Sequence, residues 1–300
     1  MAIPVELRDG DRALAVVYPE LGGWLTRYAR QVPGHGLVDA LHHDAAVVAR
    51  WPQNMWAGNP ILFPHVSYNV HAGVEGKYPL DGRVFESPQH GFGRRVPWTV
   101  AARDAAAVTL ELTDGEHTRP SYPFAFRHRL TYRLAAGRLV LDQEVENRDA
   151  RPLPFSTGIH PYLRVPLTPA GERNRCLVRL PAATHFVPAD KAASFSREAW
   201  TAHDLSVAED VSGTVFLGEL ARPEIALVDP VAGLATTLNW AAAPAYRFVA
   251  LWARTTAEPY YCVEPWTALP NSFGRADGER ITLPPGGRWT ARLGLDIGPG

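Results

Sequence analysis

Lysine and cysteine are both scarce in this chain of 300 residues. Its only lysines are Lys77 and Lys191, and the other basic side chains are arginines, which we attribute to genomic composition rather than to function. Its only cysteines are Cys176 and Cys262, and two cysteines this far apart do not make a disulfide framework. We therefore expect a reducing compartment and a fold that needs no disulfide.

Long apolar runs and an excess of one charge are also missing. No segment approaches the ~20 apolar residues of a membrane span, and the charged N-terminal stretch has no apolar signal-peptide core. With a formal net charge of −1, the chain has no field that would attract nucleic acid or an anionic membrane. We expect a cytoplasmic protein whose partner is a neutral or weakly charged small molecule.

Long helices are excluded as well, because the 27 prolines and 25 glycines are spread along the whole chain. Short alternating runs dominate instead, and residues 126–148 read as a hairpin with a glycine-containing turn. The helix candidates are weak, at residues 43–51 and 196–200. Since nothing marks a domain boundary, we predict a single all-β domain over residues 1–300, a large sandwich whose long loops carry the site.

Three segments combine ionisable side chains with turn residues and aromatics. They are "PQHGFGRRVPW" at 88–98, "STGIHPYLRV" at 156–165 and "YYCVEPWTALPN" at 260–271. His160 and Glu264 each precede a proline, which pushes the preceding residue into an extended conformation. Both are therefore expected at strand ends on restricted backbones, which suits fixed catalytic groups. Either one alone reads more simply as a hydrogen-bonded core histidine or a solvated carboxylate.

In this order the three segments resemble the "HGFAR…W", "G-x-H-P-Y-F" and "EPW-T-x-L-P-N" stretches of the aldose 1-epimerase (mutarotase) family. "NPILFPH", "YPFAFRHRLTYRL" and "LPPGGRW" also resemble family segments, so the likeness covers about residues 55–295. The resemblance implies a large antiparallel β-sandwich, the galactose mutarotase-like supersandwich, and interconversion of the α and β anomers of an aldose. It implies His160 as the general acid and Glu264 as the general base.

The resemblance also implies residues that bind the sugar. The five candidates are His90, Arg94, Asp210, Trp266 and Tyr162. His90 would hydrogen-bond the sugar near the reacting carbon, and Asp210 is the best match to a family aspartate. Aromatic rings, Trp98 and Trp252 included, are candidates to lie against the apolar face of the sugar, although large aromatics mostly fill cores.

One family feature is absent. Ser67 and Tyr68 stand where many members have a glycine and an arginine whose guanidinium reaches the sugar. Arg94 is the candidate to replace that arginine, while Arg95 would point the other way on a strand. The preference of the family for galactose or glucose therefore does not carry over, and the sequence leaves the aldose open.

Ring opening, the first half of anomer exchange, needs only two proton transfers. Ring opening takes a proton from the anomeric hydroxyl and adds one to the ring oxygen, and rotation followed by reclosure gives the other anomer. A histidine and a glutamate suffice if burial raises the pKa of the glutamate, so no metal or cofactor is expected. We expect the two side chains to face each other across a pocket, separated by about the width of the reacting edge of a sugar.

Alternative functions remain open from the sequence. Arg94 and Arg95 suit phosphate, which would make the protein a hexose-6-phosphate 1-epimerase. A non-catalytic carbohydrate-binding protein would keep the fold but has no reason to keep both His160 and Glu264 before prolines. A glycoside hydrolase would need two carboxylates, and the segments offer one. Monomer and homodimer are equally open.

Overall fold

The hairpin expected at residues 126–148 is present in the computed structural model, which describes residues 2–209, 213–242, 245–276 and 278–300. Strands β12 (Phe126–Ala135) and β13 (Arg138–Asn147) pair antiparallel, and along both of them buried side chains alternate with more exposed ones. Successive residues of a strand point to opposite faces, so this alternation buries one face of the hairpin. Ala136 and Gly137 both have positive φ, which favours a tight two-residue turn.

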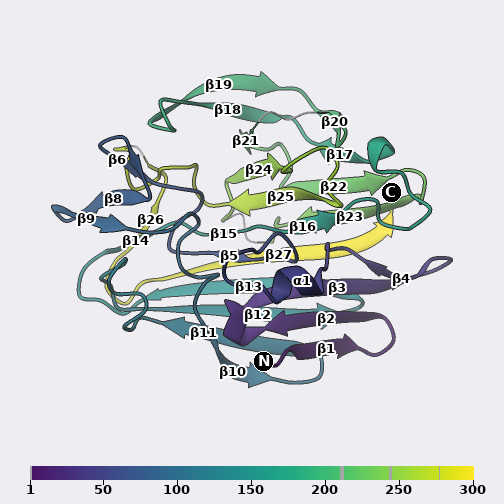
Figure 1. Ribbon diagram of the computed structural model, residues 1–300, viewed down its shortest axis with the longest axis horizontal. Coiled ribbons are helices and arrows are strands. Elements are labelled where there is room, and N and C mark those ends of the chain that lie inside the picture. The colour runs from purple at the N-terminus through teal and green to yellow at the C-terminus, as the bar shows by residue number, and fades with distance from the viewer. Residues whose placement is uncertain (1, 210–212, 243–244, 277) are drawn as a thin grey trace.

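This hairpin belongs to a nine-stranded antiparallel sheet. Its order is β10 (Thr99–Arg103), β11 (Ala107–Thr113), β12, β13, β27 (Arg288–Pro299), β23 (Leu234–Asn239), β22 (Glu224–Asp229), β17 (Leu177–Leu180) and β20 (His203–Ser206). Strand β27 lies between β13 and β23 and so joins the N-terminal strands to the later ones. Figure 1 shows it in yellow between the teal strands below and the green strands above.

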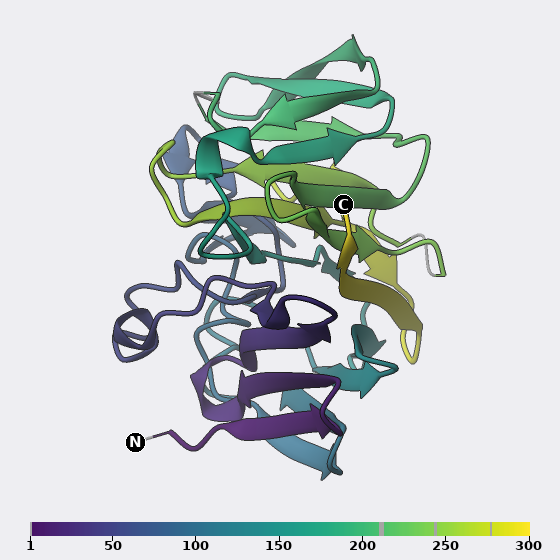
Figure 2. The same ribbon diagram turned by 90° about the vertical axis from the view of Figure 1, so that its right-hand side faces the viewer.

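A second large sheet has eight strands and carries the candidate site. Its order is β19 (Ser194–Trp200), β18 (Ala183–Ala189), β21 (Val215–Gly218), β24 (Phe248–Trp252), β25 (Tyr260–Trp266), β15 (Gly158–Ile159) and β5 (Ile61–Leu62), and β16 (Tyr162–Arg164) also pairs with β25. A four-stranded sheet holds β1 (Val5–Asp9), β2 (Ala13–Tyr18), β3 (Trp24–Val32) and β4 (Gly36–Asp39). Figure 2 shows the strands stacked from the N-terminal sheet to the β18–β19 edge.

The remaining elements are short. Two-stranded pairs are formed by β14 (Leu153–Phe155) with β26 (Ile281–Leu283), β6 (Val70–His71) with β7 (Val74–Glu75), and β8 (Lys77–Leu80) with β9 (Arg83–Glu86). The helices are α1 (Ala45–Val48) and the 3-10 turns Pro19–Leu21 and Arg173–Arg175. Helix α1 lies in the first predicted helix segment, and the Asp44 side chain accepts the N–H groups of its first turn.

The second predicted helix is wrong. Residues 196–200 belong to strand β19, which pairs with β18 along its whole length. Arg197, Glu198 and Ala199 favour helices as isolated residues, but cross-strand pairing overrides that weak preference. The prediction of an all-β fold of large antiparallel sheets is confirmed, and none of the helices in the described ranges has the length and apolar character to span a membrane.

Candidate active site

Strand pairing brings His160 and Glu264 together although 103 residues separate them in the chain. On one side of Pro161 Gly158 pairs with Trp266, and on the other side Tyr162 pairs with Cys262, so the same register sets His160 opposite Glu264. Gly158 permits this approach, because a Cβ there would lie 2.5 Å from Cδ1 of Trp266 and 2.9 Å from the Pro265 carbonyl oxygen.

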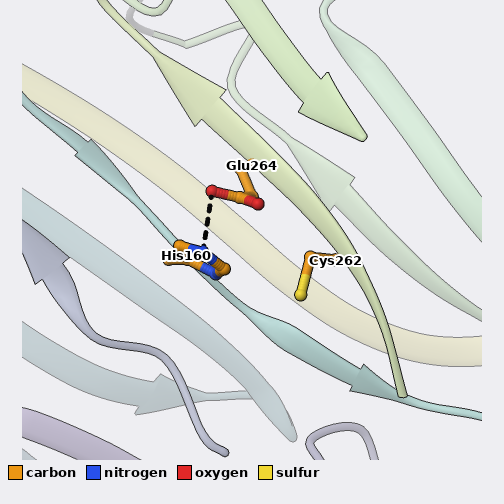
Figure 3. A group of neighbouring side chains, drawn as sticks. All are labelled: His160, Cys262 and Glu264. Carbon is orange, nitrogen blue, oxygen red and sulfur yellow. Dashed lines mark ion pairs between the residues drawn. The ribbon is translucent and has the colours of Figure 1, made fainter. Parts of the chain in front are cut away.

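The two side chains are in direct contact. His160 Nε2 lies 3.3 Å from Glu264 Oε2, and both residues are almost fully buried. Figure 3 shows the histidine between β15 and β16 pointing at the carboxylate on β25. The two groups face each other as predicted, and the adjacent strands hold them in contact, within one hydrogen-bonding distance, and not across an open pocket.

Burial controls the protonation of this pair. Desolvation raises the pKa of the Glu264 carboxyl well above its ordinary value, while the nearby Arg94 charge acts in the opposite direction. Desolvation, followed by repulsion from Arg94, holds the pKa of His160 well below its ordinary value. Both shifts favour the uncharged forms, a protonated Glu264 beside a neutral His160.

The imidazole of His160 is held by its surroundings. Tyr162 stacks on it with ring centroids 4.7 Å apart and planes inclined by 11°. The His160 backbone N–H donates to Oδ1 of Asn59 and to the Pro60 carbonyl, both at 3.1 Å. The ring is thus fixed in both position and plane before any ligand binds, as precise proton transfer requires.

His90 reaches the same cavity from the turn between β9 and β10. Its φ of 65° lies in the left-handed region, as does the φ of 52° at Ser67. The Ser67 backbone N–H donates to His90 Nδ1 at 3.0 Å. Because a backbone N–H can only donate, Nδ1 must be the acceptor, and the proton of this ring sits on Nε2. Burial lowers the pKa of His90 well below its ordinary value, so it is a neutral donor.

Arg94 also lines the cavity and is buried, whereas Arg95 is half-buried and donates to the Pro52 carbonyl. One terminal nitrogen of Arg94 donates to the Gln89 carbonyl at 3.1 Å, and its Nε has no hydrogen-bond partner among the described residues. Burial lowers the pKa of Arg94 to about 10, so the group still carries its charge at neutral pH. Arg94 therefore provides a buried positive charge and an N–H donor at Nε that is available to a ligand.

These side chains enclose a cavity of about 280 Å³, which has a buried floor and a more exposed rim. The buried floor consists of Ser67, His90, Arg94, His160, Tyr162, Glu264 and Trp266. The more exposed rim consists of Trp56, Gln89, Thr214 and Trp252. The cavity is of a size that one small ligand fills, with aromatic walls and a few polar groups.

Most of the predicted sugar-binding residues thus converge on one cavity. Asp210 lies outside the described residues. Trp98 does not reach the cavity, because it is buried in the core and its indole N–H donates to the Gly93 carbonyl. Sequence reasoning missed Trp56 and Thr214, which belong to none of the three motifs, and it missed Gln89 although Gln89 directly precedes His90 in the first motif.

One group of possible metal ligands occurs among the described residues. His160, Cys262 and Glu264 offer a nitrogen, a sulfur and a carboxylate oxygen that lie within 4.8 Å of one another (Figure 3). Cys262 and Glu264 are two residues apart on β25 and therefore share a face of the strand. The set has the donor types that zinc prefers. The positive charge of Arg94, which acts on both Glu264 and His160, is unfavourable for a metal cation there. Burial also raises the pKa of the Cys262 thiol, which opposes the thiolate form that binds metal.

Comparison with protein families gives one match across nearly the whole chain. The family model described as "Aldose 1-epimerase" matches residues 5–296. Among curated proteins, "Putative glucose-6-phosphate 1-epimerase" of Escherichia coli (strain K12) is 32% identical over 78 residues. That match covers 24% of this chain and 26% of the relative, about a quarter of each.

Solved structures with a similar fold match over full length. The Slr1438 protein from Synechocystis sp. PCC 6803 is 22% identical, with a TM-score of 0.83, and the match covers 100% of this chain and 97% of that one. The galactose mutarotase related enzyme from Lactobacillus acidophilus is 19% identical, with a TM-score of 0.79 and coverage of 99% and 97%. These likenesses confirm the galactose mutarotase-like β-sandwich.

Proposed function

Because the chain belongs to the aldose 1-epimerase family, we propose that it is an isomerase that interconverts the α and β anomers of a free aldose. The observation that carries the proposal is the contact between His160 Nε2 and Glu264 Oε2 at the floor of a sugar-sized cavity. The anomeric and ring oxygens of an aldose are bonded to the same carbon. An acid and a base that serve these neighbouring oxygens must be close neighbours themselves.

The reaction begins from ionised Glu264 and protonated His160, which hold the same single shared proton as the neutral pair. Glu264 takes the proton of the anomeric hydroxyl, the bond between C1 and the ring oxygen breaks, and His160 gives its proton to the ring oxygen. Rotation about the C1–C2 bond presents the other face of the new carbonyl. The reverse transfers close the ring and restore both groups, so no proton is gained or lost.

The rest of the floor supports these transfers. His90 donates from Nε2 to the sugar near C1, where negative charge develops as the proton leaves. Arg94 binds sugar hydroxyls, and its charge favours the ionised form of Glu264. Tyr162 keeps the His160 ring in plane, and Trp266 provides an apolar wall. Each general acid or base transfer contributes about 10² to 10⁴ in rate.

The decisive test replaces the two proton-transfer groups. Glu264→Gln keeps the shape but not the basic carboxylate, so we expect sugar binding to persist and kcat to fall by about two to four orders of magnitude. His160→Asn is expected to act likewise through the acid. NMR exchange between anomers of glucose, galactose, xylose and mannose measures the rate, and ligand-observed NMR measures binding. Near wild-type exchange in either variant would overturn the proposal. So would an unmodified protein that binds these aldoses without accelerating the exchange of their anomers.

A hexose-6-phosphate 1-epimerase is the second candidate. It is supported by the partial match to the Escherichia coli relative and by the buried charge of Arg94. Arg95, the other arginine considered for phosphate, is not among the residues that line the cavity. Comparing anomer exchange of glucose and glucose 6-phosphate separates the candidates. A preference for the phosphate that Arg94→Ala abolishes would replace the free-sugar proposal.

A further inference from the structure

Arg94 carries a buried charge that no carboxylate among the described residues neutralises by direct contact. The residue is only 7% exposed. The hydrogen bond that its guanidinium donates within the described ranges goes to the Gln89 carbonyl, and its buried Nε has no partner there. A buried charge is normally paired, because removing it from water is costly. Arg94 therefore lacks the counter-charge that its burial leads us to expect.

The net charge of the cavity lining is that of Arg94 alone. A protonated Glu264 beside a neutral His160 carries no net charge, and neither does the ionised pair from which the reaction begins. Burial keeps His90 neutral as well, and the other described residues that line the cavity are uncharged. The lining thus has a single positive charge, which one monovalent anionic group on a ligand would neutralise.

The position of the reacting atoms determines which part of a sugar lies near Arg94. The proposed reaction requires C1 and the ring oxygen to lie at the buried floor, against Glu264 and His160. C5 is bonded to that ring oxygen and carries C6, so the C6 substituent also stays beside the floor. Arg94 belongs to the same floor, and its charge acts on both members of the pair. An anionic group at C6 would therefore lie within reach of the guanidinium.

A carboxylate matches this site better than a phosphate does. A guanidinium binds a carboxylate through two parallel N–H···O bonds, and each group brings one charge. A phosphate monoester carries a charge of about −1.5 to −2 at pH 7, so a single arginine leaves part of that charge unpaired in a buried site. Arg95 does not supply the second charge, because it donates to the Pro52 carbonyl and is not among the residues that line the cavity.

We propose that the protein acts on uronic acids, the aldoses in which C6 is a carboxylate, and that Arg94 binds this carboxylate. The guanidinium pairs with the carboxylate while C1 and the ring oxygen lie against Glu264 and His160. This inference rests on the proposed function, because only a ring whose ring oxygen lies at the floor brings C6 beside Arg94.

The test measures anomer exchange by NMR for pairs of aldoses that differ only at C6. The pairs are glucose with glucuronate and galactose with galacturonate, at pH 7, where both uronates are ionised. After subtraction of spontaneous exchange, we expect kcat/KM to be about tenfold to a hundredfold higher for at least one uronate than for its neutral counterpart, the scale of one charged hydrogen-bonded pair. Glucuronamide keeps the shape of the carboxylate without its charge and should be exchanged like glucose.

Three variants complete the test. Arg94→Met removes the charge and should abolish the preference for the uronate, whereas Arg94→Lys keeps the charge without the planar fork of donors and should retain part of the preference. The matched control is Arg95→Met, which should leave the uronate-to-glucose ratio of kcat/KM unchanged.

Three results would overturn the inference. They are an equal or lower kcat/KM for both uronates than for their neutral counterparts, a preference that survives Arg94→Met, and faster exchange of glucose 6-phosphate than of glucuronate. In the first two cases the exchange of free aldoses would still support the proposed function. Exchange of no aldose at all, uronates included, would overturn both.

Discussion

Arg94 illustrates how a single residue can set the working pH of its neighbours. After burial itself, its positive charge is the main influence on both groups of the pair, and it lowers the pKa of Glu264 as well as that of His160. The pair is active while it holds one proton, loses activity at low pH when it gains a second, and loses activity at high pH when it gives up the first. The pH profile of kcat/KM should therefore be bell-shaped.

Replacing Arg94 by methionine removes the charge but keeps an unbranched side chain. Both pKa values of the pair should then rise, and both limbs of the profile should move to higher pH, with a higher KM because sugar contacts are lost. The matched control is Arg95→Met, which removes a half-buried neighbouring arginine that does not line the cavity. Profiles of kcat/KM from pH 5 to 10 check the expectation, and an unmoved profile in Arg94→Met would contradict it.

At the scale of elements, the close pairing of β15 with β25 carries the site. Gly158→Ala would place a methyl group against Trp266 and the Pro265 carbonyl, so one of the two strands must move. We expect this to cost about 1–3 kcal/mol of unfolding free energy and to slow anomer exchange, because His160 is two residues away. Gly298→Ala on β27 is the control, since its Cβ would meet nothing within 4 Å. Urea unfolding of both variants measures the difference, and equal stabilities would refute this reading of Gly158.

Some elements could be predicted from the sequence and others could not. Strands β12 and β13 were predictable because their alternation is long and uninterrupted. Strand β19 was not, since its residues are mostly exposed and only its pairing with β18 makes it a strand. The proline-flanked motifs pointed to His160 and Glu264, but the distance between them depends on a register that no local pattern encodes. Trp56 was missed because no local pattern marks it, and only the fold brings it to the rim of the cavity.

At the scale of the whole molecule, buried neutral histidines make the fold sensitive to acid. Desolvation lowers the pKa of His65 to about 4 and that of His128 to about 3, and it holds those of His90 and His160 well below their ordinary value. Below pH 6.5 these histidines bind protons in the unfolded chain but stay neutral in the folded one, so the free energy of unfolding decreases as pH falls. Glu264, with its raised pKa, acts in the opposite sense but is a single group.

We therefore expect the free energy of unfolding to fall between pH 7 and pH 5, by up to about 1.4 kcal/mol per pH unit for each buried histidine. Urea unfolding at several pH values measures the slope. His128→Gln removes one of these groups outside the cavity, and it should make the slope shallower by about the contribution of one histidine. A free energy of unfolding that is constant over this range would show that the folded protein accommodates charged histidines.

The position of β27 between β13 and β23 also has a consequence for how the protein is made. A ribosome synthesises the strands on one side of this sheet, and then those on the other side, before it synthesises the strand that joins them. Until residues 288–299 emerge, β13 and β23 expose unpaired edges that no nearby segment can cover. The nine-stranded sheet therefore closes late and through contacts between distant parts of the chain, a topology that favours slow folding.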